Sequence, residues 1–124
     1  MQTILHIDDD NDDRELFASA VYEISNTAKC VSFSDANKAL KSLESLEVAP
    51  DYIFLDLNMP MMNGQEFLSA IKTNLNLNHI PVIIFSTSSH PATIQLLIEM
   101  GAEAFITKPA DYSEFMEILT PYVY

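Results

Sequence analysis

Two short apolar runs of this chain each end in acidic residues. Ile4–Ile7 is followed by Asp8 and Asp9. Ile53–Leu55 is followed by Asp56. A carboxylate beside a buried strand costs free energy unless it is paired or coordinated. Ligands of an open parallel sheet bind beyond the carboxyl ends of its strands, so we expect the two acidic ends to meet there. Such a cluster suits a hard cation such as Mg²⁺, which prefers oxygen ligands.

Other polar side chains follow the last two apolar runs of the chain. Ser86 and Thr87 come after the most apolar run of the chain, and Lys108 comes after the last one. A carboxylate at a cation site can attack phosphorus, while the cation and a lysine neutralise charge on the transferring phosphoryl group. A hydroxyl and an ammonium can then donate hydrogen bonds to the phosphoryl oxygens. The set therefore predicts phosphoryl transfer to Asp56.

Strand patterns alternate with helical patterns along the chain. Short apolar runs predict five strands, at 4–7, 30–33, 53–55, 82–85 and 104–106. Apolar residues at helical spacing predict helices between and after them, the first containing 16–24 and the others over 36–46, 64–73, 91–100 and 111–119. Asp10 or Asn11 is the expected cap of the first helix, and Gly101 is expected to end the fourth. Right-handed crossovers then give a doubly wound α/β fold whose five parallel strands have the order 2-1-3-4-5.

The composition narrows the possible partners. The 18 acidic and 6 basic residues give a formal net charge of −12, which repels nucleic acids and anionic membranes. Cys30 is the only cysteine, which excludes an internal disulfide and indicates a reducing compartment. No apolar run approaches the roughly 20 residues of a membrane span. We therefore expect one cytoplasmic domain over residues 1–124, with no nucleic-acid or membrane partner.

At these residues the chain resembles the receiver domain of response regulators, the phosphoacceptor module of two-component signalling. The matching residues occur in family order and span nearly the whole chain: Asp8-Asp9, Leu55-Asp56-Leu57-Asn58-Met59-Pro60, Gly64, Ser86, Gly101-Ala102 and Lys108-Pro109. The resemblance implies the flavodoxin-like form of the α/β fold. Because the chain ends at Tyr124, it is similar to stand-alone receivers. It also implies a phosphoprotein that is not an enzyme, apart from Mg²⁺-dependent self-phosphorylation from a phosphodonor and autodephosphorylation.

The resemblance assigns roles around the acidic cluster. Asp56 is the phosphoacceptor. Asp9, Asp56 and the main-chain carbonyl of Asn58 bind Mg²⁺ directly, and Asp8 orients a metal-bound water. Lys108 contacts the phosphoryl group. The donor is a sensor histidine kinase or a phosphotransfer protein of a phosphorelay.

The resemblance also implies a switch. Ser86 provides the hydroxyl that moves toward the phosphate, and Phe105 stands at the aromatic switch position, where tyrosine is frequent. Their movement reshapes the surface formed by helix four, strand five and helix five, which an unknown downstream protein target distinguishes. Family members usually have a cis peptide bond where this chain has Lys108-Pro109.

Three alternatives remain open at the sequence level. A Mg²⁺-dependent phosphohydrolase with an aspartyl intermediate needs an acid-base carboxylate two residues after the nucleophile, where this chain has Asn58. A flavin- or nucleotide-binding domain needs a phosphate loop after the first strand, where residues 8–13 are mostly acidic. A pseudo-receiver would use the fold without phosphorylation.

Some polar residues have simpler interpretations. Asp10, Asp12 and Asp13 are interpreted as acidic residues that complement the dipole at the start of the first helix. His6 is interpreted as a strand residue in the core or at its margin. The three histidines share no metal-binding spacing, so no histidine metal site is expected.

Overall fold

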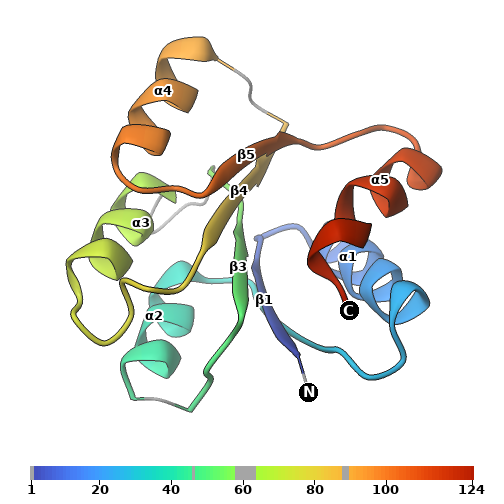
Figure 1. Ribbon diagram of the computed structural model, residues 1–124, viewed down its shortest axis with the longest axis horizontal. Helices are drawn as coiled ribbons and strands as arrows, with labels where there is room; N and C mark the ends of the chain where they lie inside the picture. Colours follow the sequence, from blue (N-terminus) through green and yellow to red (C-terminus); the bar gives the residue numbers. More distant parts are fainter. Residues whose placement is uncertain (1, 46, 58–63, 88–89) are drawn as a thin grey trace.

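The computed structural model describes residues 2–45, 47–57, 64–87 and 90–124. Within these residues a parallel five-stranded sheet forms the middle layer (Figure 1). Its strands are Thr3–Ile7 (β1), Lys29–Phe33 (β2), Tyr52–Leu55 (β3), Val82–Ser86 (β4) and Ala104–Thr107 (β5). The strand order is β2-β1-β3-β4-β5. The predicted doubly wound topology, including its order, is confirmed.

Helices cover both faces of the sheet. They are Asn11–Ile24 (α1), Ala36–Glu44 (α2), Gly64–Thr73 (α3), Pro91–Glu99 (α4) and Tyr112–Leu119 (α5), with a short 3₁₀ helix at Thr120–Tyr122 (η1). α1 and α5 lie on one side of the sheet, and α2, α3 and α4 lie on the other (Figure 1). Among the helices described, none is long and apolar enough to cross a bilayer.

The two sides of the sheet bury chemically different cores. Successive strand residues point to opposite faces, so each strand contributes to both cores. Toward α2 and α3 the buried residues are mostly aliphatic. Toward α1 and α5 they include a cluster of rings, in which Phe17 lies 5.1 Å from Phe54 and 6.0 Å from Phe115 between centroids. Because both cores are closely packed, the residue after each strand has a fixed position.

Local signals in the sequence set several helix ends. Asp10 caps α1, and its side chain accepts a hydrogen bond from the Asp13 amide. Asp35 and Asp111 cap α2 and α5 in the same way. Gly101 follows α4 with a φ of 109°, so it ends that helix with positive φ as predicted. α2 is described to Glu44, and residue 46, which was also predicted to belong to it, lies outside the described residues.

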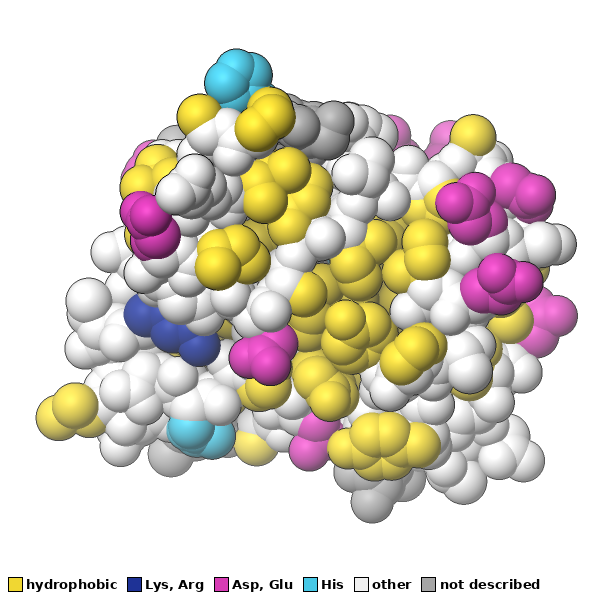
Figure 2. All heavy atoms as spheres, turned by 45° about the horizontal axis from the view of Figure 1, so that its top comes forward, with side chains coloured by type: hydrophobic (Ala, Val, Ile, Leu, Met, Phe, Trp, Pro, Cys, Tyr) yellow, Lys and Arg dark blue, Asp and Glu magenta, His cyan; other side chains and the backbone are white. Residues whose placement is uncertain are grey.

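One face of the molecule carries a group of hydrophobic side chains. Figure 2 shows hydrophobic side chains across the middle of the face formed by α4, β5 and α5. Leu96 and Ile98 of α4 are 43% and 45% exposed, and Phe105 and Ile106 of β5 are half-buried. β5 is an outer strand of the sheet, so it has no further described strand beside it.

Candidate functional site

The carboxyl-terminal end of the sheet brings the predicted acidic residues together. β1 and β3 are neighbours, with Ile7 opposite Leu55, so Asp8 and Asp56 leave adjacent strands side by side. The Asp56 amide donates a hydrogen bond to the Ile7 carbonyl at 3.0 Å, which continues the ladder by one residue. Carboxylate oxygens of Asp8, Asp9 and Asp56 all lie within 4.8 Å of one another.

This acidic cluster is chemically suited to a divalent cation. Asp8 is fully buried and Asp56 is 8% exposed, whereas Asp9 faces solvent. Three carboxylates this close repel one another in a partly desolvated place, and an oxygen-coordinated ion such as Mg²⁺ would offset that repulsion. The predicted fourth ligand, Asn58, lies outside the described residues.

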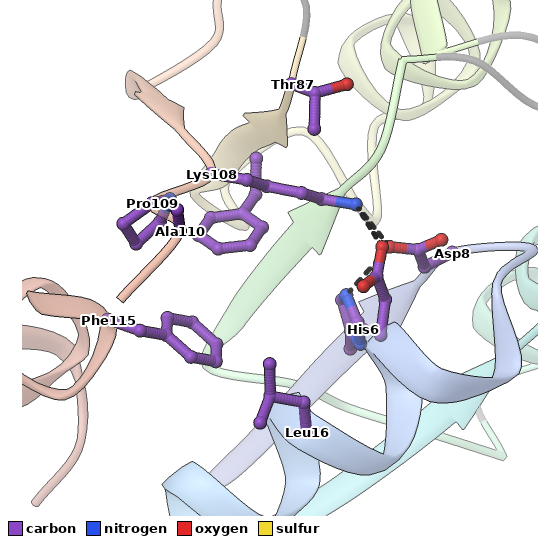
Figure 3. A pocket seen from close by; sticks show the side chains of 10 residues that line it. His6, Asp8, Leu16, Thr87, Lys108, Pro109, Ala110 and Phe115 are labelled. Atoms are coloured by element: carbon purple, nitrogen blue, oxygen red, sulfur yellow. Dashed lines mark hydrogen bonds and ion pairs between the residues drawn. The ribbon is translucent and has the colours of Figure 1, made fainter. Parts of the chain in front are cut away.

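Lys108 reaches the acidic cluster from the far side of β4. It follows β5, and its amide donates to the Ser86 carbonyl at 2.9 Å, which fixes its backbone beside the end of β4. Its Nζ donates to Asp8 Oδ2 at 2.7 Å and to Asp13 Oδ2 at 2.9 Å. Asp56 Oδ2 lies 3.8 Å from the same nitrogen. Figure 3 shows the ammonium pointing toward Asp8 across the end of the sheet.

The charge of Lys108 is maintained by its neighbours. Burial by itself lowers the pKa of the ammonium. Hydrogen bonds to Asp8 and Asp13, together with the charges of Asp56 and Asp8, outweigh burial and raise the pKa above its ordinary value. Lys108 therefore remains a cation at neutral pH, in the form that could bind a phosphoryl oxygen.

Asp13 is a site contact that the sequence analysis missed. Its backbone does take part in the cap of α1, since its amide donates to Asp10 Oδ1 at 3.0 Å. Its carboxylate, however, binds Lys108, a residue 95 positions away in the chain. An aspartate in a first helical turn carries no sequence signal for such a partner. The pair arises because the start of α1 and the end of β5 meet at the same end of the sheet.

His6 is a core residue of β1, in line with its interpretation as a strand residue in the core or at its margin. Its ring stacks on Phe17 with centroids 4.0 Å apart, and it is 1% exposed. Burial, followed by the charges of Lys108 and Arg14, lowers its pKa from 6.5 to about 3. The 3.7 Å approach of Nε2 to Asp8 Oδ2 therefore joins a neutral imidazole to a carboxylate and is not an ion pair. In the described structure, Nδ1 is buried without a hydrogen-bond partner.

The predicted switch residues lie on neighbouring strands. Ser86 ends β4 and is fully buried, and it pairs in register with Thr107 of β5. Phe105 pairs with Ile84 and packs, partly buried, against the aliphatic core. The two side chains thus belong to the adjacent strands β4 and β5.

The expected cis peptide bond between Lys108 and Pro109 is not present. No peptide bond among the described residues is cis, and both of these residues are described. This part of the expectation is wrong for this structure. The trans form is the ordinary one, favoured before proline by about 0.5–1 kcal/mol.

Gly64 allows α3 to begin directly against the segment that carries Asp56. Its amide donates to the Leu57 carbonyl at 3.0 Å. A Cβ at this position would lie 2.9 Å from Leu57 Cα, closer than real Cβ contacts, and 3.1 Å from the Asp56 carbonyl oxygen, which is also tight. Glycine is therefore required here by the close approach of two backbone segments.

A cavity of about 270 Å³ adjoins the cluster between α1 and the start of α5. Its walls combine polar groups of the site with apolar side chains of the aromatic core (Figure 3). Lining residues are His6, Asp8, Asp13, Leu16, Phe85, Thr87, Lys108, Pro109, Ala110 and Phe115. The Lys108 side chain consequently has open space along one side.

Comparisons with known proteins agree on one family. A family model described as "Response regulator receiver domain" matches residues 4–120. "Two-component response regulator ORR11" of Oryza sativa is 32% identical over 117 residues, which cover 94% of this chain and 78% of that protein. "Probable cyclic di-GMP phosphodiesterase" of Vibrio cholerae is 34% identical over 108 residues, covering 86% of this chain but 23% of that protein.

Solved structures give the same result. The phosphorylated cyanobacterial phytochrome response regulator RcpA superposes with a TM-score of 0.90 at 28% identity, covering 98% of this chain and 90% of RcpA. The Mn²⁺-bound form of response regulator Rcp1 superposes with a TM-score of 0.83 at 25% identity, covering 98% of this chain and 91% of Rcp1.

Proposed function

Because the chain belongs to the response regulator receiver domain family, we propose that residues 1–124 form one receiver domain that accepts a phosphoryl group on Asp56. One observation carries this proposal. The carboxylate of Asp56 stands at the end of β3 within a cluster of three acidic residues, with the Lys108 ammonium 3.8 Å away. A nucleophilic carboxylate, a place for a cation and a fixed ammonium are the parts that phosphoryl transfer needs.

Mg²⁺ fits the acidic cluster. Asp9 and Asp56 would supply carboxylate oxygens directly, Asp8 would orient a metal-bound water, and the family resemblance adds the main-chain carbonyl of Asn58. A bound Mg²⁺ supplies positive charge that offsets the carboxylates and polarises the phosphoryl oxygens. The structure of Mn²⁺-bound Rcp1 supports a divalent ion in this family.

The proposed donor is the phosphohistidine of a sensor kinase or a phosphotransfer protein. A carboxylate oxygen of Asp56 attacks phosphorus and forms the P–O bond of an acyl phosphate. The P–N bond of the donor breaks, and the departing imidazole nitrogen keeps the electron pair and takes a proton from water. Lys108, held beside Asp56, neutralises charge on the phosphoryl oxygens. The resulting acyl phosphate is later hydrolysed, which resets the domain.

Phosphorylation is proposed to switch the apolar face formed by α4, β5 and α5. The new phosphoryl oxygens accept a hydrogen bond from the Ser86 hydroxyl, which draws the end of β4 toward Asp56. Phe105 lies on the adjacent strand and is half-buried, so it has room to change rotamer when Ser86 moves. The downstream protein target then binds one of two arrangements of this face.

Intact mass spectrometry with Mg²⁺ and acetyl phosphate tests the phosphoacceptor. The wild type should gain the mass of one phosphoryl group, and Asp56→Asn should gain none. Asp12→Asn, which makes the same charge change on the exposed start of α1, is the matched control and should be modified like the wild type. An adduct of equal yield on Asp56→Asn would overturn the assignment of Asp56. A wild type that binds Mg²⁺ but forms no adduct with acetyl phosphate or phosphoramidate would contradict the proposed function.

A further inference from the structure

The ammonium of Lys108 has three N–H donors, and the fold directs two of them at carboxylates. One bond goes to Asp8 at 2.7 Å and the other to Asp13 at 2.9 Å. Asp56 Oδ2 lies further away, at 3.8 Å from the same nitrogen. The two short bonds therefore fix the ammonium in a position that leaves one N–H for a group carried by Asp56.

The two carboxylates that hold Lys108 differ in one respect. Asp8 belongs to the acidic cluster, so a cation bound there competes with Lys108 for the same carboxylate. Asp13 is not among the clustered carboxylates of the described residues. Its carboxylate would therefore stay available to Lys108 when the cluster holds a cation.

The backbone that carries Asp13 is fastened to the end of β1. Asp10 Oδ1 accepts the hydrogen bond of the Asp13 amide at 3.0 Å. One residue later, Arg14 Nη1 donates to the Asp8 carbonyl at 2.8 Å. The first turn of α1 is thus tied to the segment that bears the acidic cluster, and the position of the Asp13 carboxylate follows from the fold.

The cavity beside Lys108 makes such an anchor necessary. A lysine side chain is a flexible four-carbon stem with many rotamers. Here it borders about 270 Å³ of open space, whose far wall includes Leu16 and Phe115 (Figure 3). Without a fixed partner on the α1 side, the ammonium could turn into that space and away from Asp56.

We propose that Asp13 is a positioning residue, which holds the Lys108 ammonium in place to bind the phosphoryl group on Asp56. The inference rests on the proposed function of Asp56. In this role Asp13 touches neither the donor nor the reacting atoms, and acts only through Lys108. Its negative charge would by itself slow the approach of an anionic phosphodonor, so simple charge removal should speed phosphorylation, whereas loss of positioning should slow it.

The test compares Asp13→Asn with Asp12→Asn, which makes the same charge change one residue earlier. Phosphorylation by acetyl phosphate is followed at saturating Mg²⁺. We expect Asp13→Asn to react about fivefold more slowly than the wild type, since small misplacements of a catalytic group have effects of this order or larger. Asp12→Asn should be unchanged or faster, and Asp13→Glu, which restores the carboxylate, should recover part of the rate.

A double-mutant cycle separates positioning from a general effect on folding. If Asp13 acts through Lys108, Asp13→Asn should have no further effect on the phosphorylation rate in a Lys108→Ala background. An equal slowing in both backgrounds would overturn the inference. So would an equal slowing by Asp12→Asn and Asp13→Asn.

A second readout needs neither Mg²⁺ nor phosphorylation. The ¹⁵N–¹H signal of a lysine ammonium is observed when hydrogen bonds slow the exchange of its protons. In the metal-free wild type we expect this signal for Lys108, and we expect Asp13→Asn to weaken or abolish it while Asp12→Asn preserves it. An unchanged signal in Asp13→Asn would refute the anchor. If the wild type accepts no phosphoryl group, the proposed function fails, but this spectrum still decides whether Asp13 holds Lys108.

Discussion

The two ends of the sheet each hold a partly buried lysine, and the two lysines have opposite surroundings. At the carboxyl-terminal end, Lys108 binds the carboxylates of Asp8 and Asp13. At the amino-terminal end, Lys72 donates to the main-chain carbonyls of Asn78 and Ile80 at 3.2 and 3.1 Å. Burial lowers the pKa of Lys72, with the charge of Glu103 opposing it, whereas the carboxylates around Lys108 raise its pKa despite burial.

Other side-chain contacts also differ between the two ends of the sheet, being neutral at one end and charged at the other. At the amino-terminal end, Gln2 donates to the Tyr122 carbonyl at 2.6 Å and accepts from the Tyr124 amide at 2.9 Å, so neutral groups satisfy one another within the chain. At the carboxyl-terminal end, three clustered carboxylates and Asp13 face a single lysine among the described residues. The contacts at the first end join neutral groups, while the second end gathers more carboxylates than its lysine neutralises.

The largest expected effect is a loss of stability in acid, caused by His6 beside the acidic cluster. His6 is neutral in the folded protein because its pKa is lowered from 6.5 to about 3. The unfolded chain binds a proton below 6.5, so the stabilisation is complete above that pH and is lost as the pH falls toward 3. This one group should remove about 1.4 kcal/mol per pH unit in that range.

Urea unfolding of His6→Leu between about pH 7 and pH 4 measures how much His6 contributes to the loss of stability in acid. The free energy of unfolding of the variant should fall less steeply with acid than that of the wild type. His79→Gln, which changes an exposed histidine, is the control and should follow the wild type. Parallel curves for wild type and His6→Leu would show that His6 is not buried in its neutral form.

Replacing each of the two glycines by alanine should destabilise the protein, but only one replacement should also weaken Mg²⁺ binding. Gly64→Ala places a Cβ against the Leu57 backbone and the Asp56 carbonyl, and we expect a loss of about 2 kcal/mol together with weaker Mg²⁺ binding. Gly101→Ala puts a side chain at a φ of 109° and should cost about 1 kcal/mol or more. Mg²⁺ binding should be unchanged in Gly101→Ala, because Gly101 packs on Lys72 at the other end.

Urea midpoints and Mg²⁺ titrations of both glycine variants check this prediction. Equal changes in Mg²⁺ affinity would contradict the division between the two ends of the sheet. A Gly64→Ala protein with unchanged stability would mean that α3 can shift away from Leu57 at no cost.

Removing one carboxylate from the cluster should stabilise the metal-free protein. Asp9 is the exposed member of the cluster, and like charges about 4 Å apart repel by about 1 kcal/mol in water. In the presence of EDTA, Asp9→Asn should therefore raise the free energy of unfolding by about that amount. In Mg²⁺ the wild type should be more stable than Asp9→Asn, because the wild type gains binding energy that the variant has lost. A variant less stable than the wild type in EDTA would show that the carboxylates do not strain the metal-free site.

The smallest expected effect occurs at alkaline pH, where Lys108 and Lys72 should change the free energy of unfolding in opposite directions as the pH rises. The raised pKa of Lys108 gives stability that is present below the unfolded value and is lost as the pH rises through the folded one. The lowered pKa of Lys72 does the opposite, since the unfolded chain keeps the proton longer and stability rises with pH just below the ordinary lysine pKa. Urea unfolding from about pH 8 to pH 11 gives the slope of the free energy of unfolding against pH. Relative to the wild type, Lys108→Met and Lys72→Met should change this slope with opposite signs. Slope changes of the same sign in both variants would contradict the difference in surroundings between Lys108 and Lys72.

Much of the fold followed from local patterns. The apolar runs and helical spacings predicted the five strands and the five α-helices described, in the confirmed order, because both cores need apolar residues at fixed periods. The 3₁₀ helix η1 was not predicted. Asp10 and Gly101 marked helix ends through capping and positive φ, which are local effects. The meeting of Asp8, Asp9 and Asp56 also followed, since residues after adjacent parallel strands must lie side by side.

Other features had no local signal. The sequence analysis assigned Asp13 to the helix dipole alone, and its bond to Lys108 depends on how closely α1 approaches the end of β5. The trans peptide bond before Pro109 differed from what the resemblance implied. Asn58, the remaining predicted ligand, lies outside the described residues and stays a prediction.

The polar residue types at the carboxyl-terminal end of the sheet can be read from the chain, because hydrophobic periodicity fixes where each strand stops. Which acidic residues share Lys108 and which form the cluster depends on the packing of the folded protein. The physical reason is distance: hydrogen bonds and charges act over a few ångströms, and the packing of α1 and β5 against the sheet sets which side chains come that close.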